Sequence, residues 1–405
     1  SKRMLFYSTP YGTKALIEIE ERLNDMNTFK IGGVHPHDNK QYSVHLPITE
    51  CPLPQEAIIP LVQHIGAPTQ AVVEVGAKVK VGELIAKAGG FVSANICSPV
   101  SGTVTRIDTT TDAWGAPMPA IFIQVEGDEW LPEIDRSADL IYQCNLDSKA
   151  IIDKIAAAGI VGLGGACFPT HVKLLPPPGK KAEVLIINGV ECEPYLTCDH
   201  QLMIEHGEEI VIGIKILMKA LQVERAIIGI ENNKKDAIDH MRELVKTSLG
   251  IKVMPLKLKY PQGGEKQLID ACIGRQVPSG ALPIEVGAVV DNVATVYAVY
   301  EAVQKNKPLI SRVMTVTGKQ VLHPGNYMVR FGTPIEEVIA MAGGIPAGTG
   351  KIIAGGPMMG RPMSNLQSPV MKGCSGVTVI SGAEALRGEP SACIKCAKCI
   401  EACPM

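Results

Sequence analysis

The sequence predicts a multidomain α/β protein with a barrel-sandwich-like β domain, a parallel α/β domain, a β-grasp domain and a C-terminal cysteine-rich segment. Three observations lead to this prediction. The chain has 405 residues, which is longer than a domain with a single hydrophobic core usually is. Short, glycine-punctuated β-type stretches come first, and apolar strands alternating with helical stretches follow. Four cysteines fall within the last thirteen residues.

The composition excludes several classes of function. The net charge is −2 and only 4% of the residues are aromatic, so we expect no nucleic-acid partner. No apolar run reaches the roughly 18 residues that a membrane-spanning helix needs, and membrane association would therefore come through partners. No secretory signal precedes the twelve cysteines, so most are expected to be reduced cytosolic thiols.

The first two ranges are an N-terminal extension, residues 1–30, and a barrel-sandwich-like β domain, residues 31–140. In the second range "AVVEVGAKVKVGELIAKAGG" alternates apolar and polar residues between glycine turns. The stretch resembles the hybrid fold of lipoyl and biotinyl carriers. The sequence "GGFVSANICSP" lacks the lysine that such carriers modify, which favours a structural or docking role over a carrier role.

The middle of the chain, residues 141–310, predicts a parallel α/β domain. The run "AEVLIINGV" is typical of a strand buried on both faces, and one helix is expected over residues 199–221. Residues 311–365 predict a β-grasp domain: two strands joined by an "HPGN" turn, a helix and a return strand. Thr333, Pro334 and Glu336 form an expected capping box at the start of that helix.

The last range, residues 366–405, is predicted to be a linker and the start of a ferredoxin-like iron–sulfur domain that continues beyond residue 405. Cys393, Cys396, Cys399 and Cys403 have the C-x2-C-x2-C-x3-C-P spacing of 4Fe–4S ligands. Zinc is the alternative, but it usually takes two separated cysteine pairs. Cys403 either closes this cluster or ligates a second one. We favour the second arrangement, with two clusters in the full-length chain.

A glycine-rich loop is the other strong signal. The stretch "GIVGLGGACFPTHVKLLPP" contains Gly159, Gly162, Gly164 and Gly165, where backbone can approach a flat or phosphorylated ligand closely. The spacing matches neither G-x-G-x-x-G nor a P-loop. A nucleotide-binding loop is only slightly favoured over a structural turn.

Three further stretches follow predicted strands of the α/β domain. Glu191 and Glu193 lie in "NGVECEPYLTCDH", where a ligand site and a solvated turn are equally good interpretations. "YPQGGEKQL" contains Glu265, and "VVDNVATVYAV" enters a helix whose N-terminus suits a phosphate. Because these loops are expected to meet at one edge of the sheet, together they favour a ligand site there.

These motifs resemble one known family, RnfC, a component of the Rnf electron transport complex. "GGVHPHDNK", "GLGGACFPTHVKL", "NGVECEPYLTCDH", "YPQGGEKQL" and the terminal cysteine run occur in that family in this order and at this spacing. The α/β and β-grasp ranges also resemble the flavin-bearing NADH-oxidising subunit of respiratory complex I, which makes the β-grasp domain SLBB-like.

The resemblance implies a peripheral subunit on the cytoplasmic side of the cell membrane. Such a protein exchanges electrons between NAD(H), FMN and 4Fe–4S clusters, and the complex couples this transfer to ion transport. The implied partners are NAD(H), the other Rnf subunits including membrane-embedded ones, and indirectly ferredoxin. No side chain is expected to act as an acid or base. The alternative is a non-catalytic scaffold that relays electrons through clusters without a flavin.

The resemblance also implies two groups of site residues. The first would hold FMN: Gly162, Gly164, Gly165, Lys173, Asn188, Glu191 and Asn292. The second would contact NAD(H): Phe168, Glu193 and Glu265. The chain departs from complex I-type loops at Cys167, where they carry glycine, and this side chain is expected to narrow the pocket.

Overall fold

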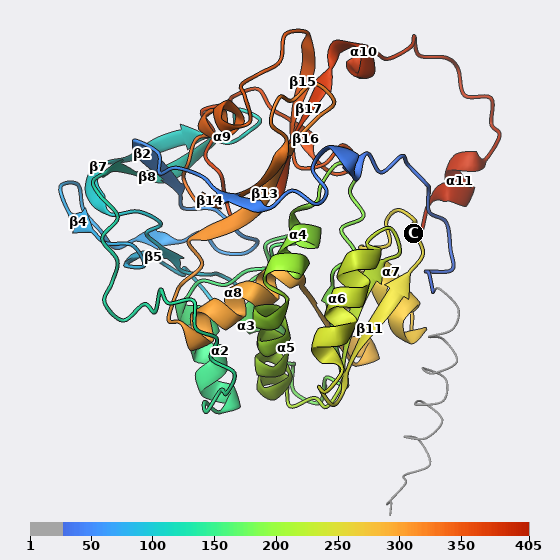
Figure 1. The fold of residues 1–405 in the computed structure, drawn as a ribbon, viewed down its shortest axis with the longest axis horizontal. Helices are drawn as coiled ribbons and strands as arrows, with labels where there is room; N and C mark the ends of the chain where they lie inside the picture. Colours follow the sequence, from blue (N-terminus) through green and yellow to red (C-terminus); the bar gives the residue numbers. More distant parts are fainter. Residues whose placement is uncertain (1–26, 405) are drawn as a thin grey trace, which may run out of the picture.

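The computed structural model describes residues 27–404, so most of the predicted N-terminal extension lies outside the described residues. Figure 1 shows three packed bodies: the β domain at one side, the α/β domain below and the β-grasp domain above. The cysteine-rich segment leaves the β-grasp domain and passes α10 (Gly382–Ala385) on its way to α11 (Lys398–Ala402).

The β domain is built from two small sheets that share one core. Both sheets are antiparallel, with the orders β2-β8-β7-β4 and β3-β5-β6. Apolar side chains from both sheets, including Ile59, Ile85 and Ile121, are buried between them. The strands are β2 (Glu56–Pro60), β3 (Gln70–Ala71), β4 (Lys78–Val79), β5 (Leu84–Lys87), β6 (Ile96–Cys97), β7 (Gly102–Thr111) and β8 (Pro117–Val125). This arrangement agrees with the predicted barrel-sandwich-like fold.

The α/β domain contains a four-stranded parallel sheet with the order β11-β10-β9-β12. Its strands are β9 (Val184–Asn188), β10 (Ala226–Glu231), β11 (Ile251–Leu256) and β12 (Ala288–Asn292). In β9, Leu185 and Ile187 belong to one core cluster and Val184 and Ile186 to another. Both faces are therefore covered, which explains why this strand reads as a continuous apolar run.

Helices cover the two faces of this sheet unequally. The larger cluster collects apolar side chains of α2, α5, α6 and α8, whereas α7 and η2 cover the other face. The helices of the domain are α2 (Ser148–Ala157), α3 (Thr170–Lys173), α4 (Cys198–Glu205), α5 (Gly207–Leu221), α6 (Lys235–Val245), α7 (Glu265–Ile273), η2 (Pro283–Val286) and α8 (Val293–Gln304). The larger cluster continues into the β-grasp domain through Val313 and Val329, so the two domains share a core.

The single helix predicted over residues 199–221 was wrong. The chain forms α4 and α5, which are separated at His206, where the backbone leaves the helical region. A Cβ on Gly207 would lie 2.5 Å from Leu244 Cδ1 and 2.9 Å from His240 Nε2, both on α6. The chain changes direction at the point where α6 packs against a residue without a side chain.

The β-grasp domain has the predicted two strands, helix and return strand, but its sheet reaches beyond residues 311–365. The order is β1-β14-β13-β17-β15-β16. β17 comes from the range predicted to be a linker, and β1 comes from the range of the β domain. The elements are β1 (Ile48–Glu50), β13 (Ser311–Thr317), β14 (Gly325–Arg330), α9 (Ile335–Met341), β15 (Thr349–Ala354), β16 (Arg361–Pro362) and β17 (Gly376–Ser381).

The predicted capping box at the start of α9 was also wrong. Pro334 occupies the N-cap position and no side chain caps the helix. The Thr333 hydroxyl instead donates to the Arg330 carbonyl at 2.9 Å. The Ile335 and Glu336 amides donate to the carbonyls of Ser368 and Leu366, so the crossing chain satisfies the first turn.

Candidate functional site

The candidate site lies at the carboxyl edge of the parallel sheet, where α/β proteins commonly bind ligands. Asn188 ends β9 and Asn292 ends β12, and the two residues are paired in register. The Asn188 side chain donates to the Gly263 carbonyl at 2.9 Å and accepts from the Val190 amide at 3.2 Å. The sheet therefore joins the "NGVECEPYLTCDH" and "YPQGGEKQL" loops through one amide side chain, and the expected convergence of the loops is observed.

The glycine-rich loop sits beside the same edge. The Leu163 amide donates to Thr295 Oγ1 at 2.9 Å, which ties the loop to the first turn of α8. A Cβ on Gly164 would lie 3.1 Å from Asn292 Cβ, so the loop backbone packs directly on the end of β12. At Gly165, which has φ +143°, a Cβ would meet nothing within 4 Å. The loop is thus anchored on one side and open on the other.

Cys167 does not narrow this open side, contrary to expectation. Its side chain is buried, and a Cβ on Gly373 would lie 2.8 Å from its sulfur. Burial raises the pKa of the Cys167 thiol. The thiol is therefore a packed, protonated group on the protein side of the loop. Phe168 follows it and is half-buried, and its carbonyl accepts from the Gly162 amide at 2.9 Å.

Asn292 connects the end of β12 to the loop after β9. Its side-chain oxygen accepts from the Ala294 amide at 2.9 Å and caps α8. Its amide nitrogen donates to Asp199 Oδ2 at 2.7 Å. Burial, followed by the nearby Glu191 carboxylate, raises the pKa of Asp199 to about 7. The side chain predicted to face a phosphate is therefore already part of an internal network.

Lys173, on α3, reaches β12 and the start of α7. Its ammonium donates to the Val290 carbonyl at 2.7 Å and lies 3.3 Å from Glu265 Oε1. The neighbouring Asp291 carboxylate is buried and accepts no hydrogen bond within residues 27–404. Burial raises the pKa of Asp291 to about 6, although Lys173 opposes the shift. Lys173, which the resemblance assigns to FMN, and Glu265, which it assigns to NAD(H), are therefore in contact.

Glu191 and Glu193 point in different directions. Glu191, which has a positive φ of 46°, accepts from the Asp199 amide at 2.7 Å at the start of α4. Glu193 accepts from the amides of Met358 and Met359 at 3.1 and 2.6 Å. The β-grasp domain therefore reaches over the α/β domain at Glu193. Burial raises the pKa of this carboxyl group, and the two amides oppose the rise.

Two buried lysines form part of this edge and were not anticipated from the sequence. The Lys40 ammonium donates to the Glu191 and Glu193 carbonyls, each at 3.0 Å, and to the Leu196 carbonyl. Lys234 is fully buried and donates to the Val190 carbonyl at 2.7 Å. Because lysines are normally exposed, nothing in the composition indicated that these two would be buried. Lys40 is nevertheless the last residue of the "GGVHPHDNK" motif.

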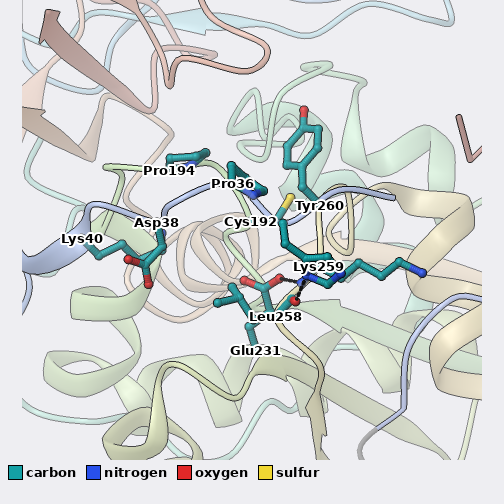
Figure 2. Close-up of a pocket in the computed structure, with 10 residues that line it drawn as sticks. Pro36, Asp38, Lys40, Cys192, Pro194, Glu231, Leu258, Lys259 and Tyr260 are labelled. Atoms are coloured by element: carbon teal, nitrogen blue, oxygen red, sulfur yellow. Dashed lines mark hydrogen bonds between the residues drawn. The ribbon is translucent and has the colours of Figure 1, made fainter. Parts of the chain in front are cut away.

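A small pocket lies next to these lysines. Figure 2 shows it between the Pro36–Asp38 turn, the Cys192–Pro194 turn and residues 258–260. The Lys259 amide donates to Glu231 Oε1 at 3.3 Å at its base. The residues of "GGVHPHDNK" therefore line the same edge as the glycine-rich loop, although they belong to the start of the described chain.

The four terminal cysteines lie in an exposed loop at the other end of the chain. Cys393, Cys396, Cys399 and Cys403 are all exposed. Lys395 and Ala397 have φ of 56° and 62°, and the Lys395 amide lies 3.4 Å from the Cys393 sulfur. The positive φ values of these two residues turn the backbone sharply, so that the loop wraps around the Cys393 sulfur. Four closely spaced thiols are the donor set that an iron–sulfur cluster requires, so these residues fit such a group.

Three family models match successive parts of the chain. They are the RnfC barrel sandwich hybrid domain over residues 27–128, the Nuo51 FMN-binding domain over residues 155–301 and the SLBB domain over residues 313–362. The order and types of these matches confirm the predicted fold class. The Nuo51-type match covers the glycine-rich loop and the carboxyl ends of all four strands of the parallel sheet.

Curated relatives match over nearly the whole chain. The C component of the proton-translocating ferredoxin:NAD(+) oxidoreductase complex of Clostridium ljungdahlii is 47% identical over 375 residues, which are 92% of this chain and 81% of the relative. The Na(+)-translocating counterpart of Acetobacterium woodii is 42% identical, covering 93% and 85% of the two chains. The C component of the ion-translocating oxidoreductase complex of Rhodobacter capsulatus is 40% identical, covering 96% and 75%.

A solved structure of an NAD+-reducing NiFe-hydrogenase in its H2-reduced state has 22% identity and a TM-score of 0.49, covering 58% of this chain and 47% of its own. Among residues 27–404, no helix combines the length and the apolar character needed to cross a membrane. The identities to the curated relatives, together with the three domain matches, establish that the chain belongs to the RnfC family, a component of Rnf-type ion-translocating oxidoreductase complexes.

Proposed function

We propose that this chain is the peripheral subunit of an Rnf-type ferredoxin:NAD oxidoreductase that exchanges hydride between NAD(H) and FMN and passes single electrons to 4Fe–4S clusters. The observation that carries the proposal is the meeting of four features at one sheet edge: the open glycine-rich loop, Asn188, the N-terminus of α8 and the Glu265 end of α7. Parallel sheets bind nucleotides and flavins at such edges.

The residues proposed to hold FMN differ in how far they are free to do so. Gly165 presents its backbone next to open space, whereas Gly164 packs on Asn292 and Gly162 on Phe168. The N-terminus of α8 lies beside the same loop. A helix N-terminus favours a phosphate because its first amides lack partners within the helix. Lys173 reaches this region once it exchanges the Val290 carbonyl for a phosphate oxygen. FMN, when bound, supplies the exchange between two-electron and one-electron chemistry.

Asn188, Asn292 and Glu191 act mainly by shaping this site. Asn188 holds the Gly263 carbonyl, and Asn292 holds the first turn of α8. Glu191 holds the start of α4. Their hydrogen bonds fix the loops before any ligand arrives, so little conformational entropy remains to be lost on binding. We propose that their remaining polar atoms contact the flavin and its ribityl phosphate.

NAD(H) is proposed to enter beside the flavin, with Phe168 stacking on the adenine and Glu193 and Glu265 next to the ribose and nicotinamide. Glu265 lies at the start of α7 beside Lys173. Glu193 lies under residues 355–360, so a nucleotide that reaches its carboxylate displaces the Met358 and Met359 amides. No side chain needs to donate or remove a proton for hydride transfer.

The cysteine run is proposed to ligate the iron–sulfur part of the pathway. Cys393, Cys396 and Cys399 would hold the first 4Fe–4S cluster, and Cys403 would ligate a second in the full-length protein. The proposed setting is the cytoplasmic side of the cell membrane, with membrane-embedded Rnf subunits as partners and ferredoxin as the indirect electron carrier.

The test is a titration of anaerobically purified protein with NADH. We expect a releasable FMN, and NADH should bleach the flavin absorbance before the cluster absorbance falls. Protein that contains iron but no flavin would instead support the scaffold alternative, in which electrons pass through clusters only.

A glycine variant locates the flavin. Gly165→Val places a side chain in the open space above the loop, so we expect FMN content to fall to background with normal iron content. Gly179→Val is the matched control because Gly179 also has a positive φ, +79°, and open surroundings, but lies outside the site. Equal flavin content in the two variants would rule out the loop as the binding site.

A further inference from the structure

The first residues of the described chain, 27–34, form a strap along the edge of the α/β domain. The Lys257 amide donates to the Asn27 carbonyl at 3.0 Å, next to the end of β11. The Thr28 hydroxyl donates to Gln262 Oε1 at 2.7 Å, and Phe29 is buried. The strap therefore extends the sheet edge through both backbone and side chains.

The middle of the strap holds the cysteine loop. The Gly33 amide donates to the carbonyl of Ala402, the last residue of α11, at 2.8 Å. A Cβ on Gly32 would lie 2.5 Å from both the carbonyl carbon and the oxygen of Cys403, and 2.7 Å from the Pro404 nitrogen. Figure 1 shows the start of the described chain running beside α11.

The end of the strap is paired with the proposed flavin site. Val34 and Tyr260 exchange two backbone hydrogen bonds, each 2.8 Å long. Tyr260 begins the loop whose Gly263 carbonyl accepts from Asn188 at 2.9 Å. A short series of hydrogen bonds therefore leads from the cysteine loop through the strap to the carboxyl edge of the sheet.

We propose that residues 27–34 are a bracket that fixes the cysteine loop relative to the flavin edge, and that Gly32 is its positioning residue. This inference rests on the proposed function, because the bracket matters for electron transfer only if the site and the loop both carry redox groups. The loop is otherwise exposed, so the strap supplies contacts that its own short helix lacks.

The choice of Gly32 follows from two independent constraints. Its φ of +64° is a conformation that residues with a Cβ rarely adopt. Its missing side chain also leaves room for the Cys403–Pro404 backbone, which cannot yield as a flexible side chain could. An alanine at this position must push the two backbones apart, and the displaced backbone contains a proposed cluster ligand.

The first test is hydrogen exchange on the anaerobic, cluster-loaded full chain. We expect Gly32→Ala to accelerate exchange of the Gly33 and Cys403 amides about tenfold or more. Gly127→Ala is the matched control, since Gly127 has a φ of +69° and a Cβ there would meet nothing within 4 Å. Exchange that is equally fast in Gly32→Ala, Gly127→Ala and the parent chain would overturn the bracket.

Thr28→Val is a milder variant that decides the question if Gly32→Ala does not fold. It removes the 2.7 Å hydrogen bond to Gln262 while keeping the side-chain volume, and it leaves the cysteine loop untouched. We expect faster exchange at Gly33 and Cys403, by a smaller factor than with Gly32→Ala. No change relative to Gly127→Ala would count against the bracket.

The second test separates the bracket from the proposed function. In rapid mixing with NADH, Gly32→Ala should bleach flavin at the parental rate but reduce the clusters more slowly, whereas Gly127→Ala should match the parent in both. Unaltered cluster reduction in Gly32→Ala would overturn the positioning role. Failure of NADH to bleach the parent flavin would overturn the proposed function, and the exchange measurement would still test the strap.

Discussion

The glycine-rich loop and the cysteine loop both use unusual backbone to prepare a cofactor site, but they are supported very differently. The first is anchored to α8 through Thr295 and lies against Asn292, within a domain whose sheet is buried on both faces. The second is exposed along its length and relies on the strap. One site is therefore formed by the fold, whereas the other depends on the strap and on the cluster proposed for its cysteines.

The two sites differ in which interactions provide the free energy that orders their backbone. Around the glycine-rich loop, apolar burial orders the elements, and polar side chains such as Asn292 then fix the loops. Around the cysteines, few apolar side chains are buried, so the proposed ligation of iron–sulfur clusters by their thiolates would supply the ordering. Substitutions at the sheet edge should therefore change the stability of the α/β domain, and substitutions in the cysteine loop should not.

The largest expected effect is at the buried ion pair of Lys234 and Glu231, whose charged atoms lie 3.7 Å apart. Burial lowers the pKa of Lys234 to about 8 and raises the pKa of Glu231, so desolvation outweighs their attraction. Lys234→Met leaves the Glu231 carboxylate without its partner and should lower the free energy of unfolding of the α/β domain by about 3–5 kcal/mol.

The measurement for Lys234→Met is denaturant-dependent hydrogen exchange of the β9–β12 amides. Lys149→Met, which removes an exposed ion pair with Asp153, is the control and should leave the exchange of these amides nearly unchanged. Adding Glu231→Gln to Lys234→Met should restore part of the loss. Equal effects of the two lysine substitutions would mean that the edge is no better ordered than the surface.

The next effect is a pH dependence at Asp199. Its pKa is raised from 3.8 to about 7, mainly by burial and then by Glu191, and the rise is opposed by the Asn292 hydrogen bond and by the charges of Arg312 and Lys234. Between pH 4 and 7 the unfolded chain binds fewer protons at this group, so stability falls as the pH rises. Asp199→Asn should remove the share of this decline that comes from Asp199, about 2–4 kcal/mol, in denaturation curves at several pH values. The share that comes from other buried carboxyl groups such as Asp291 should remain.

The control for this prediction is Asp153→Asn, which changes an exposed carboxylate. It should keep the parental decline between pH 4 and 7. If Asp199→Asn keeps the full parental decline, the Asp199 carboxyl group is ionised in the folded protein and the network around Asn292 is differently charged.

A smaller effect is expected at the contact between domains. Glu193→Gln keeps an acceptor for one of the Met358 and Met359 amides but removes the charge, and should lower stability by about 1 kcal/mol. It should also weaken NADH binding in a titration of the flavin absorbance, while FMN content stays at the parental level. Unchanged NADH affinity would remove Glu193 from the proposed nucleotide site.

The smallest effect on the fold is expected from the cysteines themselves. Cys396→Ser should abolish the first 4Fe–4S signal in electron paramagnetic resonance and lower the iron content, yet leave exchange at β9–β12 within about 0.5 kcal/mol of the parent. Cys144→Ser, at a half-buried cysteine outside the run, is the control for the iron content. A large loss of α/β stability in Cys396→Ser would contradict the expectation that the cysteine loop does not contribute to the stability of the α/β domain.

Much of the architecture could be predicted from the sequence because it depends on local patterns. The continuous apolar run of β9 indicated burial on both faces, and the spacing of the four cysteines indicated a ligand loop. The single helix over residues 199–221 could not be corrected from the sequence, since its break depends on the packing of α6 against Gly207. The capping box failed for a similar reason: the chain near Ser368 supplies the acceptors at the start of α9.

The order of domains and the glycine-rich loop could be predicted from the chain, because each is encoded by residues that are close together. The cysteine run is local in the same sense, and its role as a ligand set stays a prediction. Three other features emerged only on folding: the burial of Lys40 and Lys234, the position of Glu193 under the β-grasp domain and the contact of Gly32 with Cys403. Those contacts join residues far apart in the chain. Whether such a contact stabilises or destabilises the protein depends on burial and on the distance between the groups. No local sequence pattern carries that information.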